Sequence, residues 1–421
     1  LAPEYDGRGL PSAESLIRVF DAVAELTAAG KVRSAYTPGY GGAAEGIYKM
    51  GLGNRIGFRF DDGFAVENAF SYGYGSFLLE LAEDAEPVGV PVGVTLSDWV
   101  LEGNGETVSL EEIEAVYDAR LESVYPCNVE QTEEPLKTFV YEKRGARKAS
   151  GAGIARPKVL IPVFPGTNCE YDTARAFEDA GAKAEIVLVR NLTPGALVET
   201  AEVMRKQIES SQIIMLPGGF SGGDEPDGSG KFIAAFFRNP ALTEAIHEFL
   251  NKRDGLMAGI CNGFQALIKM GLVPYGKISE ADESFPTLAP NLIGRHQSKL
   301  IRTRIASVKS PWLSECEVGE IHTMAISHGE GRFVCSRELL DQLAENGQIA
   351  TQYVDEDGSP TMEIQYNPNG SYYAVEGITS PDGRIFGKMG HTERMLRPGL
   401  YKNVCTPAGN GMFKSAVKYF K

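Results

Sequence analysis

The sequence predicts an α/β fold in which a parallel sheet flanked by helices follows a smaller α+β module. Three observations predict it. From residue 157 onward, short apolar stretches alternate with amphipathic ones, which is typical of a parallel sheet covered by helices on both faces. Before residue 142 the pattern is irregular and acidic. Residues 142–156 are small, basic and without apolar periodicity, which predicts a linker between domains at 1–141 and 157–421.

The individual elements follow from local patterns. Residues 12–29 should form a helix capped by Ser12, because Leu16, Val19 and Phe20 begin a helical repeat. A glycine-rich turn at 39–46 leads into a second helix, followed by strands at 76–82 and 91–95 and a helix at 111–123. In the second domain we expect strand 158–164, helix 169–181, strand 184–189, helix 196–210, strand 212–216, helices 231–238 and 241–252, strand 256–260 and helix 264–270.

Composition and charge narrow the possible functions. The chain has 421 residues and a net charge of −15, and residues 1–150 hold 13 Lys and Arg against 25 Asp and Glu. This acidity argues against binding nucleic acid or a membrane surface, which need basic patches. The six cysteines are scattered without a Cys-x-x-Cys pair, and no signal peptide or membrane span is visible. We therefore expect a reduced, cytoplasmic protein, and the first residue, Leu1, indicates a piece of a longer chain.

The strongest chemical signal is the segment Gly259-Ile260-Cys261-Asn262-Gly263, between an apolar strand and a helix. It matches the nucleophile elbow, a tight strand-to-helix turn that presents a nucleophile, here Cys261. Side chains at Gly259 and Gly263 would collide with neighbouring backbone, and the N–H groups at the helix start favour a thiolate. The alternative is a buried structural cysteine.

A cysteine nucleophile needs a base, and the base needs a group that orients it. Among five histidines, His391 is the best candidate. In an extended segment Glu393 would share its face and accept a hydrogen bond from Nδ1. The alternative is a surface histidine beside a surface glutamate.

Cysteine and histidine also raise the question of a metal site, for which the candidates would be Cys316, His322, His328 and Cys335. Structural zinc ligands come in closely spaced pairs, whereas these gaps are wide and uneven. We therefore expect no metal site.

Two glycine-rich segments lie at expected strand ends or turns. Glycines within 215–224 would let a backbone N–H approach a ligand, and one such donor with the N–H of Asn262 could form an oxyanion hole. Residues 326–333 are too glycine-rich and charged for a core strand, so we expect them to face the pocket. A flexible loop and a solvated hairpin tip are the respective alternatives.

The chain resembles a known family over nearly its whole length. The segments that carry the resemblance are, in order, Phe164-Pro165-Gly166-Thr167-Asn168-Cys169-Glu170, Leu216-Pro217-Gly218-Gly219-Phe220-Ser221, Gly259-Ile260-Cys261-Asn262-Gly263-Phe264-Gln265, Ser327-His328-Gly329-Glu330-Gly331-Arg332 and His391-Thr392-Glu393-Arg394. They are similar to the glutaminase domain of the large single-chain phosphoribosylformylglycinamidine synthases, which are class I glutamine amidotransferases. Less sharply, residues 36–45 and 50–54 resemble the end of the synthetase region, a module shared with the C-terminal domain of aminoimidazole ribonucleotide synthetase.

The resemblance implies an activity and its partners. Glutamine would be hydrolysed to glutamate and ammonia, which passes to a synthetase site where ATP activates formylglycinamide ribonucleotide for conversion to the amidine, a step of purine biosynthesis. No cofactor is implied for the glutaminase domain, and Mg-ATP is implied for the full synthetase. This chain lacks the upstream synthetase residues, so we expect it to be slow or idle alone.

The resemblance also implies residue roles. Cys261 would attack the glutamine amide, His391 would carry the proton and Glu393 would orient His391. The oxyanion would be held by N–H groups of Asn262 and of Gly219 or Phe220. Weaker candidates for glutamine binding are Gln265, Asn168 and His328.

Two other functions stay open. A cysteine hydrolase or peptidase of the same fold would need no synthetase, and the wide sequence separation of His391 from Cys261 together with the synthetase-like module disfavours it. A non-catalytic binding domain with a decayed site is disfavoured because the cysteine, the histidine and Glu393 occur together.

Overall fold

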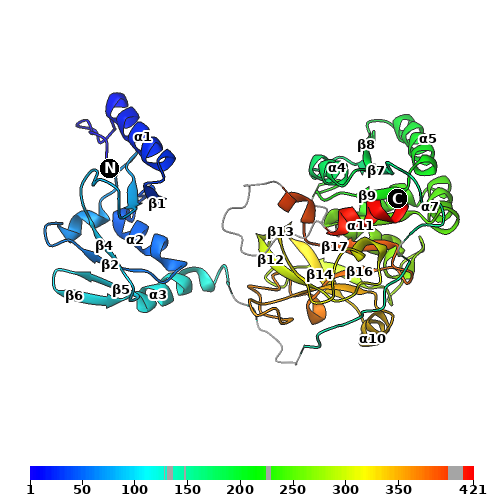
Figure 1. The fold of residues 1–421 in the computed structure, drawn as a ribbon. Helices are drawn as coiled ribbons and strands as arrows, with labels where there is room; N and C mark the ends of the chain where they lie inside the picture. The colour runs from blue at the N-terminus through cyan, green and yellow to red at the C-terminus, as the bar shows by residue number, and fades with distance from the viewer. Residues whose placement is uncertain (128, 130–135, 147, 224–228, 397–410) are drawn as a thin grey trace. The chain divides into compact units, whose positions relative to one another are not determined.

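The computed structural model describes the whole chain except residues 128, 130–135, 147, 224–228 and 397–410. The chain divides into two compact units, Leu1–Cys127 and Asn128–Lys421 (Figure 1). Within the described residues, each unit has two sheets and at least one cluster of buried apolar side chains of its own; in the second unit the smaller sheet is the pair β11 (Thr287–Pro290) and β14 (Glu330–Val334).

The first unit is the predicted α+β module. Its helices are α1 (Ala13–Ala28), α2 (Gly42–Leu52) and α3 (Leu110–Glu122), with the 3-10 helix η1 (Val66–Phe70). Strands β1 (Val32–Tyr36) and β3 (Leu78–Leu81) pair antiparallel, and a second sheet has the order β4 (Gly93–Leu96), β2 (Gly57–Phe60), β5 (Val100–Gly103), β6 (Glu106–Ser109). The Ser12 side chain accepts a hydrogen bond from the Ser15 N–H, which confirms the predicted cap of α1. Four strands, β1, β2, β5 and β6, were not predicted.

The second unit contains the alternating elements. Its helices are α4 (Glu170–Asp179), α5 (Pro194–Ser210), α6 (Lys231–Phe237), α7 (Pro240–Arg253), α8 (Asn262–Met270), α9 (Leu272–Tyr275), α10 (Arg337–Glu345) and α11 (Gly411–Phe420), with the 3-10 helices η2 (Pro311–Leu313), η3 (Tyr372–Ala374) and η4 (Thr392–Leu396). Its strands are β7 (Lys158–Val163), β8 (Lys183–Leu188), β9 (Ile213–Leu216), β10 (Leu256–Ile260), β11 (Thr287–Pro290), β12 (Gln297–Ile305), β13 (Ile321–His328), β14 (Glu330–Val334), β15 (Ile349–Tyr353), β16 (Val375–Thr379) and β17 (Ile385–Lys388).

Nine of these strands form one sheet in the order β13-β12-β15-β16-β17-β10-β9-β7-β8. The half from β17 to β8 is parallel, as predicted. The half from β13 to β17 is antiparallel, and the sequence did not predict it. Strands β9 and β10 are buried throughout, as expected where helices cover both faces. Helix α8 packs on β10, α4 packs on β7 and β8, and α11 contacts α4; Figure 1 shows α4 and α11 beside the sheet.

The segment predicted to be a linker packs on the second unit instead. Phe139, just before it, is 5% exposed, and its N–H donates to Gln352 Oε1 at 2.9 Å. The Arg144 guanidinium donates to the Ser314 carbonyl at 3.0 Å, and Ala149 is buried. The unit boundary after residue 127 therefore lies earlier than the predicted linker 142–156. Single contacts such as these produce no apolar periodicity in the sequence, so the segment was predicted to be a linker although it packs on the domain.

None of the helices within the described ranges is long and apolar enough to cross a membrane.

Candidate active site

Cys261 sits on the turn between β10 and α8, where the sequence predicted a nucleophile elbow. Its backbone φ of +51° lies in a region that residues other than glycine rarely adopt. A Cβ at Gly259 would lie 2.5 Å from the Gly263 carbonyl carbon, and one at Gly263 would lie 2.1 Å from the Leu216 oxygen. The Cys261 N–H donates to the Lys388 carbonyl of β17 at 2.8 Å. The predicted collisions are confirmed, and the two glycines let β9, β10 and α8 hold the strained turn.

The Gly263→Ala substitution should therefore damage the second unit. The new methyl group meets the Leu216 carbonyl, which is backbone of β9 and cannot rotate away. We expect a loss of about 3 kcal/mol or more in the free energy of unfolding, the upper end for overpacking, measured by urea denaturation. The control is Gly195→Ala in the first turn of α5, where the nearest atom lies 4.0 Å away. That change should be neutral or stabilising by up to ~1 kcal/mol. Equal stability of the two variants would contradict this account of the elbow.

His391 and Glu393 form a buried pair beside the elbow. His391 Nδ1 and Glu393 Oε1 are 2.7 Å apart, so the ring N–H donates to the carboxylate. The two side chains meet across the start of the 3-10 helix η4 rather than along the predicted extended segment. The His391 N–H donates to the Ala325 carbonyl of β13 at 2.8 Å, which fixes the loop to the sheet.

The surroundings of His391 favour its charged form. Burial alone would lower its pKa, but the charge of Glu393 and hydrogen bonds with Cys169, Cys261 and Glu393 raise the pKa of His391 well above its ordinary value. The Cys261 thiol itself donates to the Ser327 carbonyl of β13 at 3.9 Å, on the strand whose Ala325 carbonyl also holds the His391 loop. Because Nδ1 faces Glu393, the nitrogen left to exchange a proton with Cys261 is Nε2.

A buried polar network that the sequence did not predict surrounds this loop. The Lys388 ammonium donates to Thr392 Oγ1 at 2.8 Å and lies 3.9 Å from Glu376 Oε1. Glu376 Oε1 also accepts the Gly390 N–H at 2.6 Å. Burial lowers the pKa of Lys388, against the opposing effect of Glu376. These contacts fix the positions of Gly390 and Thr392, the two residues that flank His391.

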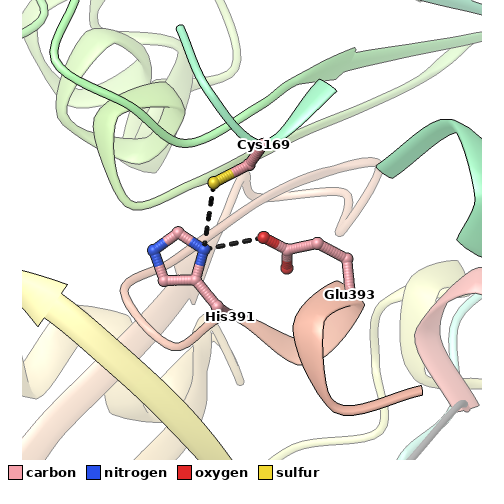
Figure 2. Close-up of side chains that lie close together, drawn as sticks. All are labelled: Cys169, His391 and Glu393. Carbon is pink, nitrogen blue, oxygen red and sulfur yellow. Dashed lines mark hydrogen bonds and ion pairs between the residues drawn. The ribbon is translucent and has the colours of Figure 1, made fainter. Parts of the chain in front are cut away.

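Cys169 is a site residue to which the sequence assigned no role. Its Sγ lies 3.8 Å from His391 Nδ1, on the same side of the ring as Glu393 (Figure 2). It immediately precedes α4, just after the carboxyl end of β7, as Cys261 follows β10. Carboxyl ends of parallel strands share one edge of the sheet, where ligand sites form. Applied to every strand, that rule would have placed Cys169 at the site.

The predicted oxyanion-hole donors differ in availability. The Phe220 N–H donates to the Gly166 carbonyl at 2.8 Å, so it is already used, which argues against Phe220. Gly219 lies close to the β7–α4 loop, and a Cβ there would stand 2.6 Å from the Gly166 oxygen. Asn262 Oδ1 accepts the Ser221 N–H at 3.2 Å, which ties this loop to the elbow. Gly219 and Asn262 remain the better pair of donors.

The three weaker candidates for glutamine binding have different surroundings. Both ends of the Gln265 amide are engaged, since Nε2 donates to the Glu330 carbonyl at 2.6 Å and Oε1 accepts from Asn262 at 3.0 Å. Asn168 is exposed and its Oδ1 accepts from the Cys169 thiol at 3.1 Å. His328 ends β13 and is 1% exposed, and neither ring nitrogen has a partner. Burial, then the charges of His391 and His296, lower the pKa of His328 to about 3, so it is neutral at pH 7.

Two groups of potential metal ligands occur in the described part of the chain. One consists of Cys169, His391 and Glu393, and the other of Cys316, Glu320 and His322. In each, the ligand atoms lie within 4.8 Å of one another. The four residues considered from the sequence therefore do not form one cluster in the described ranges, although Cys316 and His322 do approach each other.

A strained elbow cysteine, with a nearby imidazole that pairs with a buried carboxylate, is the arrangement typical of cysteine-nucleophile enzymes of the triad type. The family comparison agrees with this class. The model of the CobB/CobQ-like glutamine amidotransferase domain matches residues 156–420, and the chain belongs to this family.

Several individual proteins are similar to the second unit. "Phosphoribosylformylglycinamidine synthase subunit PurQ" of Methanococcus maripaludis is 36% identical over 281 residues, which is 63% of this chain and 97% of that protein. The Aquifex aeolicus subunit of the same name is 35% identical over 239 residues, 56% of this chain and 90% of that protein. The solved structure "PurLQS from Thermotoga maritima" is 26% identical with a TM-score of 0.46, covering 63% of this chain and 100% of that chain.

Proposed function

We propose that the second unit hydrolyses glutamine to glutamate and ammonia, and that the ammonia is used to make phosphoribosylformylglycinamidine in purine biosynthesis. The observation that carries the proposal is the buried pair of His391 and Glu393, 2.7 Å apart, beside the strained elbow that presents the Cys261 thiol. Membership in the amidotransferase family and the printed names of the relatives support the substrate and the product.

The chemistry follows from these positions. The Cys261 thiol gives its proton to His391 Nε2, and the sulfur attacks the side-chain amide carbon of glutamine. The N–H groups of Asn262 and Gly219 stabilise the oxyanion, each contributing ~3–4 kcal/mol to the barrier reduction. His391 then returns the proton to the leaving nitrogen, which departs as ammonia. Water hydrolyses the thioester by the reverse sequence and releases glutamate.

We further propose that this chain is the C-terminal portion of a single-chain phosphoribosylformylglycinamidine synthase. The two relatives named above align with 63% and 56% of the chain, and the α+β unit precedes the matched part on the same polypeptide. Its resemblance to a synthetase module supports a role in the site that uses Mg-ATP and formylglycinamide ribonucleotide. We place the activity in the cytoplasm, where scattered thiols stay reduced.

Labelling with an electrophilic glutamine analogue tests the glutaminase assignment. We expect the full chain to be modified once, at Cys261, and glutamine to protect it, as read by peptide mass spectrometry. Cys316 and Cys335 are internal controls, because burial raises the pKa of each thiol to about 12. Modification of Cys169 instead of Cys261 would contradict the assigned nucleophile. A folded chain that is not labelled at all would favour a binding domain.

A further inference from the structure

The proposed reaction leaves one buried thiol without a task. Cys169, His391 and Glu393 are 2–3% exposed, and they come from two segments, the start of α4 and the η4 loop. Figure 2 shows the Cys169 sulfur and the Glu393 carboxylate directed at the same ring nitrogen. A soft sulfur, an imidazole nitrogen and a carboxylate oxygen within 4.8 Å of one another are a donor set suited to Zn²⁺.

The distances fit a tetrahedral ion after a small adjustment. Zinc bonds of about 2.3 Å to sulfur and about 2.0–2.2 Å to nitrogen and oxygen place S and N about 3.6 Å apart, and N and O about 3.4 Å apart. The observed separations are 3.8 Å from Cys169 Sγ to His391 Nδ1 and 2.7 Å from Nδ1 to Glu393 Oε1. The carboxylate must therefore recede by about 0.7 Å. Glu393 Oε2 is buried without a hydrogen-bond partner, so turning the carboxylate breaks no other bond.

We propose that Cys169, His391 and Glu393 form a binding site for Zn²⁺ that turns off the glutaminase reaction. On binding, Cys169 loses its thiol proton and His391 loses the proton on Nδ1, so each ion taken up releases two protons to solvent. The sulfur then leaves its hydrogen bond to Asn168 Oδ1 for the metal. A water molecule completes the four ligands.

Inhibition follows from the place of the metal on the ring. With Nδ1 bound to zinc, Nε2 can give up its proton only by leaving an imidazolate, so His391 can no longer pass a proton between Cys261 and the leaving nitrogen. Glutamine hydrolysis therefore stops, whereas synthesis from added ammonium continues. This consequence rests on the proposed function, but zinc binding itself does not.

Zinc titration of the full chain against a chromophoric chelator tests the site. We expect Cys169→Ala to bind one Zn²⁺ fewer per chain than the native protein, or to bind that ion more weakly. The loss of affinity should be at least ~10–100-fold, which is the cost of losing a residue that only hydrogen-bonds to a metal ligand. Cys261→Ala is the matched control, since its thiol is not a ligand, and it should bind like the native chain. The second cluster at Cys316 is present in all three proteins, so it cancels from the comparison.

Cobalt gives a second readout on the same proteins. Co²⁺ should produce thiolate charge-transfer absorption that is weaker in Cys169→Ala than in the native protein, because any share from Cys316 is common to both, and that Cys261→Ala keeps in full. Cys169→Ser preserves the side-chain size, so it serves if the alanine variant does not fold by circular dichroism. Native-like metal binding by the Cys169 variants, or loss of this ion in Cys261→Ala, would overturn the proposal. Zinc binding without inhibition of glutamine hydrolysis would leave the site standing and contradict the assigned role of His391.

Discussion

Replacing Cys261 with alanine in the complete synthetase should abolish glutamine-dependent synthesis while synthesis from ammonium salts persists. The substitution removes the only atom that can bond to the amide carbon, and it leaves the synthetase site untouched. Loss of the nucleophile in other triad enzymes lowers kcat by about 10⁶-fold, and we expect a loss of that order. Product formation with glutamine or with ammonium, each at saturating ribonucleotide and ATP, measures the two activities separately.

Cys335→Ala provides the matched control for this experiment. Cys335 is a half-buried thiol just after β14, and burial raises its pKa to about 12, which leaves it protonated and unreactive. This variant should retain both activities. Loss of both activities in a folded Cys261→Ala protein would show that Cys261 has a task other than attack on glutamine.

The elbow could be predicted from sequence because its constraints are local. Gly259 and Gly263 are required by atoms within a few residues, or by the neighbouring strand that ends at Leu216. The pairing of His391 with Glu393 was also predictable from their separation of two residues, although the backbone that joins them is a 3-10 turn. For this pair the predicted local conformation was wrong, yet the predicted contact was right.

The remaining features depend on contacts between residues far apart in sequence. Cys169 and His391 are 222 positions apart and meet only because β7 and β17 lie in one sheet. In the antiparallel half of the sheet, strand β13 was missed for a related reason. It is buried almost throughout, so its sequence lacks the alternation that identifies a half-exposed strand. Residues 326–333, predicted to be too glycine-rich and charged for a core strand, belong instead to the end of β13 at His328 and to β14.

The Glu393→Gln substitution should lower glutamine-dependent kcat by about 10⁴-fold, the cost of a comparable carboxylate-to-amide change at the orienting position of a triad. The amide keeps the size of the side chain and can still accept a hydrogen bond from Nδ1. It loses the negative charge that stabilises the imidazolium, and it can instead donate to Nδ1 and hold the wrong tautomer. Ammonium-dependent synthesis should be unchanged.

The pH profile distinguishes this role from a purely structural one. The charge of Glu393 is the leading cause that raises the pKa of His391 against burial, so the imidazolium survives to higher pH in the native protein. Without that charge the pKa falls, and the alkaline limb of the kcat/KM profile should move to lower pH in Glu393→Gln. Glu393→Asp keeps the charge on a shorter side chain, so its limb should stay nearer the native position even if its rate falls. A Gln variant with a native rate and an unmoved alkaline limb would remove Glu393 from the proposed mechanism and leave His391 without an orienting group.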